Sequence, residues 1–166
     1  YIALLQKTTT DSIAHVIAKR FTTLNAEAAL LSGLLSCVGR VYILTRTVRH
    51  PELFADQLAY QSLVREWHAN VAKAILENWN LPDAIVSAVS EHEDPEREQR
   101  GVITLTDVLA VASLLANFSG ENDIAQCAAP LLKPMKRMQL ELDQCTQVLK
   151  ESAEEVAALQ ATLGVA

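Results

Sequence analysis

Apolar residues along the chain recur every three or four positions, which is the spacing of one face of a helix. A first helix is expected after Asp11, a residue type that caps helix N-termini, because apolar positions follow at four-residue spacing over 13–21. Asn25 is a second cap candidate, and a wide apolar face follows it through residue 38. Gly39 is expected to close that second helix in the left-handed conformation.

The pattern beyond Gly39 also predicts helices. Residues 41–44 are rich enough in β-branched and aromatic side chains for a short strand, but helix is preferred because no partner strand occurs elsewhere. A third helix is expected to start at Pro51, since proline suits a first helical turn, and the helical pattern runs towards Trp79 with one break near Tyr60 left open. Two more are expected, one over 83–92 and a strongly apolar one over 102–118.

The last predicted helix, residues 135–163, has a seam whose positions alternate steps of three and four, as in a heptad repeat. The seam positions are Met135, Met138, Leu142, Cys145, Leu149, Ser152, Val156, Leu159 and Leu163. A coiled-coil or partner-binding helix would have this pattern, and so would a helix that lays one face on its own domain. Packing within the domain is favoured because few charges flank the seam. Together the elements predict an all-α bundle of about seven helices in a single domain over 1–166.

Composition narrows the class of protein. Half of the 166 residues are hydrophobic, which is enough for a real core. The net charge of -6 argues against a nucleic-acid partner. Three widely spaced cysteines, at 37, 127 and 145, form neither a disulfide framework nor a zinc motif, so a cytoplasmic location is expected. No membrane span is expected, because charged residues interrupt every apolar stretch.

Asp107 is the most informative polar residue, because its neighbours three and four positions away are mostly apolar. A carboxylate that faces the interior needs a partner or a metal ion. His68 and His92, both near apolar faces, are the candidates. A hydrogen bond from Asp107 to one of them is the favoured interpretation, a divalent metal bound by all three is an alternative, and the groups failing to meet is a third.

Three segments, in order and spacing, resemble the HD superfamily of metal phosphohydrolases. "EAALLSGLLSCVGRVYIL" is similar to A..AGLLHDIGKLVL, and "EWHANVAKAILENWNLPDAIVSAVSEHEDP" to H..VGA.LL..W.LP..I..AI..HH.P. "VITLTDVLAVA" resembles IV.LAD.LA. Trp79, the Leu81-Pro82 pair and the charged loop after His92 point to the HDOD branch, the HD-related output domains. The resemblance implies an HD-like helical bundle, of which this chain is expected to cover the C-terminal part.

The resemblance places the family's metal-site positions in this chain one by one. The His-Asp doublet falls at Ser36-Cys37, the middle-helix histidine at His68, the double histidine at Glu91-His92, the last aspartate at Asp107, and the first histidine near Asp11. Active superfamily members hold their metal with histidines, the aspartate of a His-Asp doublet and a final aspartate. Here Ser36 supplies no carboxylate for a hard cation, and Cys37 is expected to be a buried thiol that resists ionisation. A nucleophile pair of Cys37 with a histidine is disfavoured, because Cys37 lies on a leucine-rich face. The resulting pocket, expected to bind no metal or cofactor and to hold no catalytic residue, comprises Asp11, Ser36, Cys37, His68, Glu91, His92 and Asp107.

The resemblance therefore implies a non-catalytic bacterial signalling or regulatory module. Its expected partners are other proteins or fused signalling domains, with the last helix as the contact surface and a homo-oligomer through that helix as one option. Two alternatives remain open: a metal-dependent phosphohydrolase with an unusual ligand set, and a small-molecule sensor that uses the former metal pocket.

Overall fold

The computed structural model describes residues 7–94, 97, 101–117 and 135–163, and these residues contain helices and no strands. The all-α prediction is confirmed, and the described part has seven α-helices and one short 3₁₀ helix. The elements are α2 (Lys7–Phe21), α3 (Ala26–Leu35), α4 (Val38–Thr47), η1 (Pro51–Phe54), α5 (Gln57–Asn78), α6 (Asp83–Glu91), α7 (Leu105–Leu115) and α10 (Leu142–Leu163).

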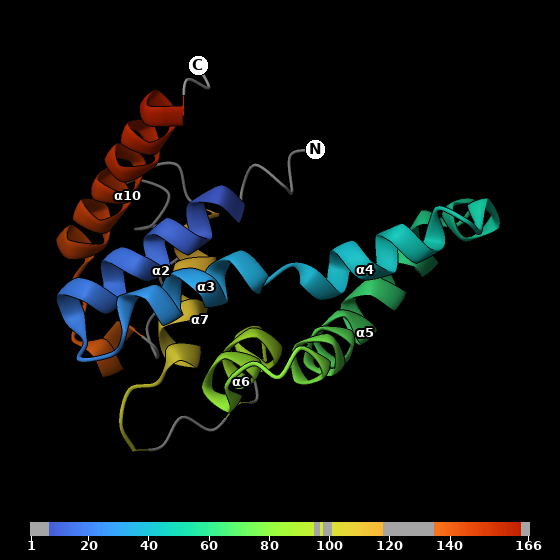
Figure 1. Ribbon diagram of the computed structural model, residues 1–166, viewed down its shortest axis with the longest axis horizontal. Helices are drawn as coiled ribbons and strands as arrows, with labels where there is room; N and C mark the ends of the chain where they lie inside the picture. The colour runs from blue at the N-terminus through green and yellow to red at the C-terminus, as the bar shows by residue number, and fades with distance from the viewer. Residues whose placement is uncertain (1–6, 95–96, 98–100, 118–134, 164–166) are drawn as a thin grey trace.

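The helices form a body and a projecting arm (Figure 1). In the body, α2 packs against α3, α7 and α10, and α6 packs against α3 and α7. The arm consists of α4, η1 and α5: α4 leads away from the body, η1 turns the chain at the tip, and α5 returns alongside α4. The part of the chain that joins arm to body therefore brings α4, α5 and α6 together.

The core lies mainly between α2 and α7. Each fully buried aliphatic side chain there stabilises the fold by roughly 1.5–3 kcal/mol relative to exposure. Almost every residue of α7 is buried, which explains why its sequence is apolar all round. The largest fully buried side chains of these two helices are Ile13, Val16, Ile17, Val108, Leu109, Val111 and Leu115.

The apolar segment that was expected as one helix closed by Gly39 is two helices with a break at 36–37. Gly39 lies inside α4 and does not have a left-handed conformation, so that prediction was wrong. The glycine serves packing instead, because a Cβ at this position would overlap the main-chain carbonyl oxygen of His68 on α5. The preference for helix over strand at 41–44 is confirmed, since these residues lie in α4.

Two other helix ends follow local rules. Asn25 caps α3 as expected, and its side chain accepts a hydrogen bond of 3.1 Å from the Ala28 N–H. The chain leaves α5 through Asn80, two residues after the helix ends at Asn78, and Asn80 has a left-handed φ of 55°. The N–H of Leu81 then donates to the carbonyl of Leu76 at 3.1 Å, which closes the helix in a Schellman motif.

The last helix is shorter than the predicted 135–163, because α10 begins at Leu142. Gln139 has a φ of 54°, and the Leu140 N–H donates to the Met135 carbonyl at 3.0 Å, which ends a short helical turn before α10 starts. The spacing of apolar side chains does not indicate which residue is left-handed. The predicted heptad seam therefore continued through Gln139, where the helix breaks.

The expected seam of α10 faces its own domain. Cys145 and Ser152 are fully buried, and α10 packs on α2. Leu142, also assigned to the seam, is 48% exposed, while Val148 is buried in a position that was not assigned to it. The described part of α10 thus confirms packing within the domain. Cys127 lies outside the described residues.

One stretch, Ala26–Thr47, is long and apolar enough to cross a membrane when judged by length and composition alone. Core helices of other proteins and signal sequences pass the same test, so the indication is weak. In this structure the stretch is divided between α3 and α4, and its Arg40 is ion-paired with Glu93.

Candidate functional site

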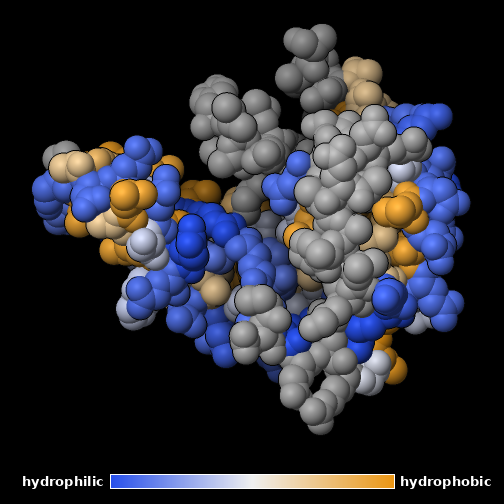
Figure 2. Space-filling model, turned by 180° about the vertical axis from the view of Figure 1, so that it is seen from behind, coloured by the Kyte–Doolittle hydropathy of each residue, from blue (hydrophilic) through white to orange (hydrophobic). Residues whose placement is uncertain are grey.

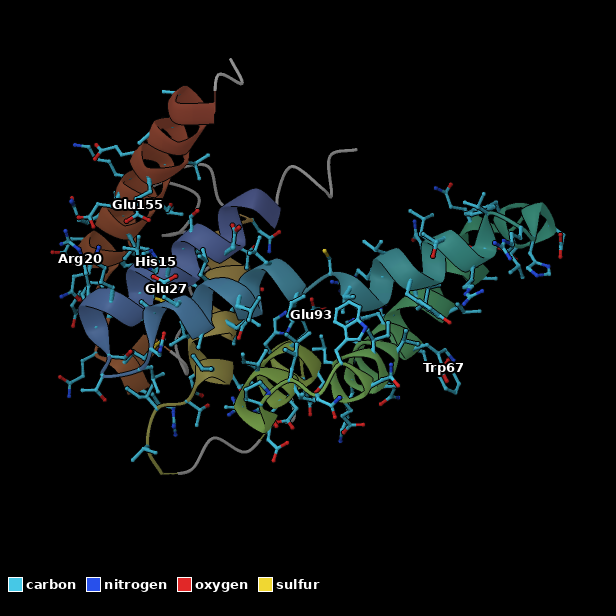
Figure 3. The ribbon with its side chains drawn as sticks, in the orientation of Figure 1. His15, Arg20, Glu27, Trp67, Glu93 and Glu155 are labelled. Atoms are coloured by element: carbon cyan, nitrogen blue, oxygen red, sulfur yellow. The ribbon has the colours of Figure 1, made fainter. Side chains whose placement is uncertain are left out.

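Four polar side chains gather where the arm joins the body. Arg40 comes from the first turn of α4 and His68 from the middle of α5, while His92 and Glu93 directly follow α6. Glu93 is central to the group and is labelled in Figure 3. This group is called the Arg40–Glu93 cluster below.

A bidentate ion pair forms the cluster's centre. The guanidinium of Arg40 donates to both carboxylate oxygens of Glu93, with 2.9 Å between Nη1 and Oε1. Such paired, charge-assisted hydrogen bonds fix orientation as well as adding energy. His68 lies against both partners: its Nε2 is 3.4 Å from Arg40 Nη2 and 3.4 Å from Glu93 Oε2.

The electrostatics of the cluster keep Glu93 ionised. Burial alone would raise the pKa of its carboxyl, but the adjacent His92 ring and the bidentate, positively charged Arg40 outweigh burial and hold the pKa well below its usual range. Glu93 is therefore an anion throughout the neutral range, and the ion pair with Arg40 is intact there.

His92 closes the inner side of the cluster. Its side chain is only 2% exposed, and its Nδ1 lies 3.0 Å from the carbonyl oxygen of Val89, which accepts the ring proton. The second ring nitrogen, Nε2, lies 3.4 Å from Glu93 Oε1 and makes no hydrogen bond among the described residues. The ring is thus held by its own helix and directed at the carboxylate.

Ser36 and Cys37 occupy the break between α3 and α4. The Ser36 hydroxyl donates to the carbonyl of Gly33 at 2.7 Å, and the Cys37 thiol lies 3.9 Å from the carbonyl of Leu34. The Gly33 carbonyl also accepts from the Ser36 N–H at 3.2 Å, so both side chains contact carbonyl groups in the last turn of α3. Ser36 is buried, whereas Cys37 is only half-buried, more open than the buried thiol that the sequence suggested.

Asp107 does not bond to either histidine, so the favoured Asp-His prediction was wrong. The carboxylate is fully buried and forms a capping box at the start of α7, accepting from the Thr104 N–H at 2.8 Å. Its other oxygen accepts from Arg97 at 3.1 Å, and Arg137 approaches at 3.5 Å. These partners satisfy the buried charge and hold the chain before α7 in place.

Asp11 was expected to cap the first helix, and this was also wrong, because α2 begins at Lys7 and Asp11 lies inside it. The side chain is buried, and its Oδ1 accepts from the Ser12 N–H at 2.9 Å. Burial raises the pKa of Asp11, partly opposed by these main-chain hydrogen bonds. Asp11 lies against Gly33, where a Cβ would overlap its backbone.

Glu91 stands outside the cluster. Its side chain is 48% exposed, and Oε2 lies 3.7 Å from Arg97 Nε. Glu93, two residues later, is the carboxylate that enters the cluster. Of the seven predicted positions the structure therefore brings together His68 and His92.

The sequence interpretation missed Arg40 and Glu93. A signal for Arg40 was present, because Arg40 aligns with the lysine of the family pattern GLLHDIGK, whereas only the doublet before it was carried over. Glu93 also had a signal, because the family pattern LP..I..AI..HH.P, aligned on Leu81-Pro82, puts its double histidine at His92 and Glu93, whereas Glu91 had been assigned to it. The partner of Glu93 is 53 residues away, and the charged run after His92 is typical of a solvated loop.

The donor set does not fit a metal ion. Within the described residues no group of three His, Cys, Asp or Glu side chains is arranged to hold one. His68 and Glu93 both contact the guanidinium of Arg40, which cannot lose its charge in a protein. A divalent cation between them would meet a positive charge at contact distance.

Comparisons with known proteins agree with this fold. The model of the HDOD domain family matches residues 5–95, more than half of the chain. Among solved structures, "Putative metal-dependent phosphohydrolase" from Shewanella amazonensis SB2B is similar, with a TM-score of 0.63 and 19% sequence identity. The match covers 90% of this chain and 59% of that chain, so this chain spans well under two thirds of the neighbour's length. At this identity the likeness concerns the fold. No curated protein sequence matches the chain.

Proposed function

The chain belongs to the HDOD domain family, and from this premise we propose that it is a non-catalytic bacterial regulatory module that acts through protein contacts. The observation that carries the proposal is the position of Arg40. Its guanidinium lies against His68 Nε2 and is bound to Glu93, at the point where a metal-binding relative would use an imidazole as a ligand.

A fixed cation in this place opposes metal binding. Two unit charges about 4 Å apart interact by roughly 4 kcal/mol near a protein surface, and a divalent ion doubles that figure before solvent screening reduces it. The negative charge of Glu93 is already neutralised by Arg40. An ion would therefore have to displace Arg40 and break a bidentate pair in order to recruit Glu93.

The remaining family positions add to the argument. The Ser36 hydroxyl is bonded to its own helix, and the Asp107 carboxylate is bonded to Thr104 and Arg97. These groups stabilise helix ends, which is a structural use of residues at metal-ligand positions. The cluster then serves to fix α4, α5 and α6 where the arm leaves the body.

Contact with other proteins suits this structure better than metal-dependent hydrolysis. The arm exposes large apolar side chains, among them Trp67, which is 51% exposed. Free thiols at Cys37 and Cys145 support a reducing compartment, so we place the module in the cytoplasm. The partners in this proposal are other signalling proteins or fused signalling domains.

Metal-dependent phosphohydrolysis is the competing function, since the similar Shewanella protein carries that name. The deciding experiment measures iron, manganese and zinc by elemental analysis in protein purified without chelator, together with phosphomonoester and phosphodiester hydrolysis in added Mn²⁺. We expect far less than one metal per chain and no hydrolysis above buffer.

A matched variant, Arg40→Met, removes the cation and keeps most of the side-chain volume. A gain of bound metal in this variant would show that Arg40 is what excludes the metal. One metal per chain in the unaltered protein, with hydrolysis abolished by His68→Ala, would overturn the proposal.

A further inference from the structure

A histidine of the body lies between carboxylates from two neighbouring helices. His15, on α2, faces Glu155 of α10 with one ring nitrogen and Glu27 of α3 with the other, and Figure 3 shows the ring between them. The distances are 3.3 Å from Nδ1 to Glu155 Oε2 and 3.6 Å from Nε2 to Glu27 Oε1. The imidazole thus bridges α3 and α10 across α2.

This arrangement suits a protonated imidazole. A neutral imidazole has one N–H and one lone pair, so it donates to only one of two carboxylates and turns its lone pair toward the other. An imidazolium donates on both sides. Glutamate side chains at a protein surface are ionised throughout the neutral range, whereas histidine ordinarily changes its charge between pH 5 and pH 8. The complete bridge therefore depends on one proton.

The other charges around His15 come from the same helices. Arg20 of α2 is already paired with Glu151 of α10, with 2.7 Å between Nε and Oε2. α7, which also packs on α2, has one charged side chain, Asp107, and its partners hold it at the start of that helix. The charge that neighbouring helices direct at the imidazole is therefore negative. The charged residues one turn away on α2 itself are the buried Asp11 and the exposed Lys19.

The bridge lies where α10 has few other contacts with the body. α10 packs on α2, and Ser152 is the last buried residue among those whose side chains are described in α10. Beyond it, Glu155 and Val156 are half-buried and their described neighbours are exposed. Figure 2 shows a mainly hydrophilic edge at the right of that view, on the side of the body where α10 lies. A segment with so few buried apolar contacts opens at low cost in free energy.

We propose that His15 is a proton-dependent latch on the second half of α10. When protonated, His15 donates to Glu27 and Glu155 and holds residues 153–163 on the body. When His15 releases its proton to the solvent, one glutamate loses its donor and this half of α10 separates, while the first half, with the buried Cys145, stays docked. Docking takes up a proton, so by linkage the docked form is favoured as the pH falls through the neutral range. The latch goes beyond the proposed function and does not depend on whether the module is catalytic.

Hydrogen–deuterium exchange at pH 6 and pH 8 tests the latch, with labelling times scaled to the intrinsic exchange rate at each pH. In the unaltered chain we expect the amides of residues 153–163 to be at least about 3-fold better protected at pH 6, which is the strength of two partly exposed ion pairs. Amides of α7, which is buried almost throughout, report any change in the whole fold, and the effect is measured relative to them. Equal relative protection of 153–163 at both pH values overturns the proposal.

Three variants assign the effect to this bridge. His15→Gln and Glu155→Gln each remove the link to α10, so the protection at pH 6 should fall to its value at pH 8. His50→Gln is the matched control, because His50 is 62% exposed on the arm with Glu52 3.0 Å from its Nδ1, and it should keep the full pH dependence. Since Glu155 is 38% exposed, Glu155→Gln decides the question even if His15→Gln does not fold. A pH dependence that survives in Glu155→Gln, or is lost in His50→Gln, overturns the proposal.

Discussion

The guanidinium of Arg40 lies 3.4 Å from Nε2 of His68, so this imidazole nitrogen faces a fixed organic cation. Glu93 neutralises that cation from the other side. The three side chains come from α4, α5 and the segment after α6, and together they tie the arm to the body.

The lowered pKa of Glu93 makes stability depend on pH. A carboxyl whose pKa is lower in the folded state stabilises the fold above its unfolded pKa of about 4.3, and this contribution is lost as the pH falls toward the folded value. We therefore expect the free energy of unfolding to fall below about pH 5, and Glu93→Gln to reduce this dependence.

Urea unfolding at pH 7 and pH 3 measures the effect of Glu93, because the contribution is lost mainly below the unfolded pKa. Glu66→Gln is the control, because Glu66 lies exposed on α5. The expected result is that Glu93→Gln destabilises the protein at pH 7 and makes a smaller difference at pH 3. The same loss at both pH values would contradict the role of the ionised carboxylate.

Gly39→Ala should be strongly destabilising. The added methyl group would overlap the carbonyl oxygen of His68, and main-chain atoms on two packed helices cannot move apart without opening the arm. We expect a loss of about 2–4 kcal/mol in the free energy of unfolding, although alanine is the better helix former. Thr45→Ala, at an exposed position of the same helix, should change stability by less than about 0.5 kcal/mol. A stable Gly39→Ala protein would show that the close approach of α4 to α5 is not required.

Much of this fold could be predicted from the sequence, because apolar periodicity reports which face of a helix is buried. Apolar periodicity gave the correct buried helix for α7, whose apolar residues are buried almost throughout. It failed at 36–37 and at Gln139, where the helix breaks but the side-chain pattern continues. The backbone conformation at such points depends on packing between distant segments.

The candidate site was less predictable for the same reason. Arg40 and Glu93 are 53 residues apart and meet only through the packing of α4, α5 and α6. The partner of Asp107 was partly visible, because Thr104 lies three residues before it in capping-box spacing. The Asp107 carboxylate is hydrogen-bonded locally, by Thr104 in the capping box, and not by the distant histidine that had been expected.

Asp107→Ala is expected to destabilise the protein by about 3–5 kcal/mol, because it removes the anion from a buried pair and leaves Arg97 without it. Asp107→Asn should cost less, since an amide oxygen can still accept from the Thr104 N–H. Thermal or urea unfolding of both variants, with Arg97→Ala and the double variant to complete the cycle, measures the coupling. Additive effects would mean that the ion pair of Asp107 with Arg97 contributes nothing to stability.

The two described cysteines should differ in reactivity. Cys145 is fully buried on α10, and burial, together with the negative charge of Asp143, raises the pKa of its thiol to about 11. At pH 8 only about one thiol in a thousand would then be ionised, and the thiolate is the reactive species. Cys37 is half-buried and more accessible.

A Cys127→Ser protein, which retains only these two thiols, allows the comparison with an aromatic disulfide reagent. We expect one rapidly modified thiol, assigned to Cys37 by peptide mass, and a second that reacts only when urea unfolds the chain. Because Cys145 is fully buried and α10 packs on α2, its modification also reports release of α10 from the body. Equal rates in the folded protein would mean that α10 separates from α2 readily, and the last helix would then be available to partners after all.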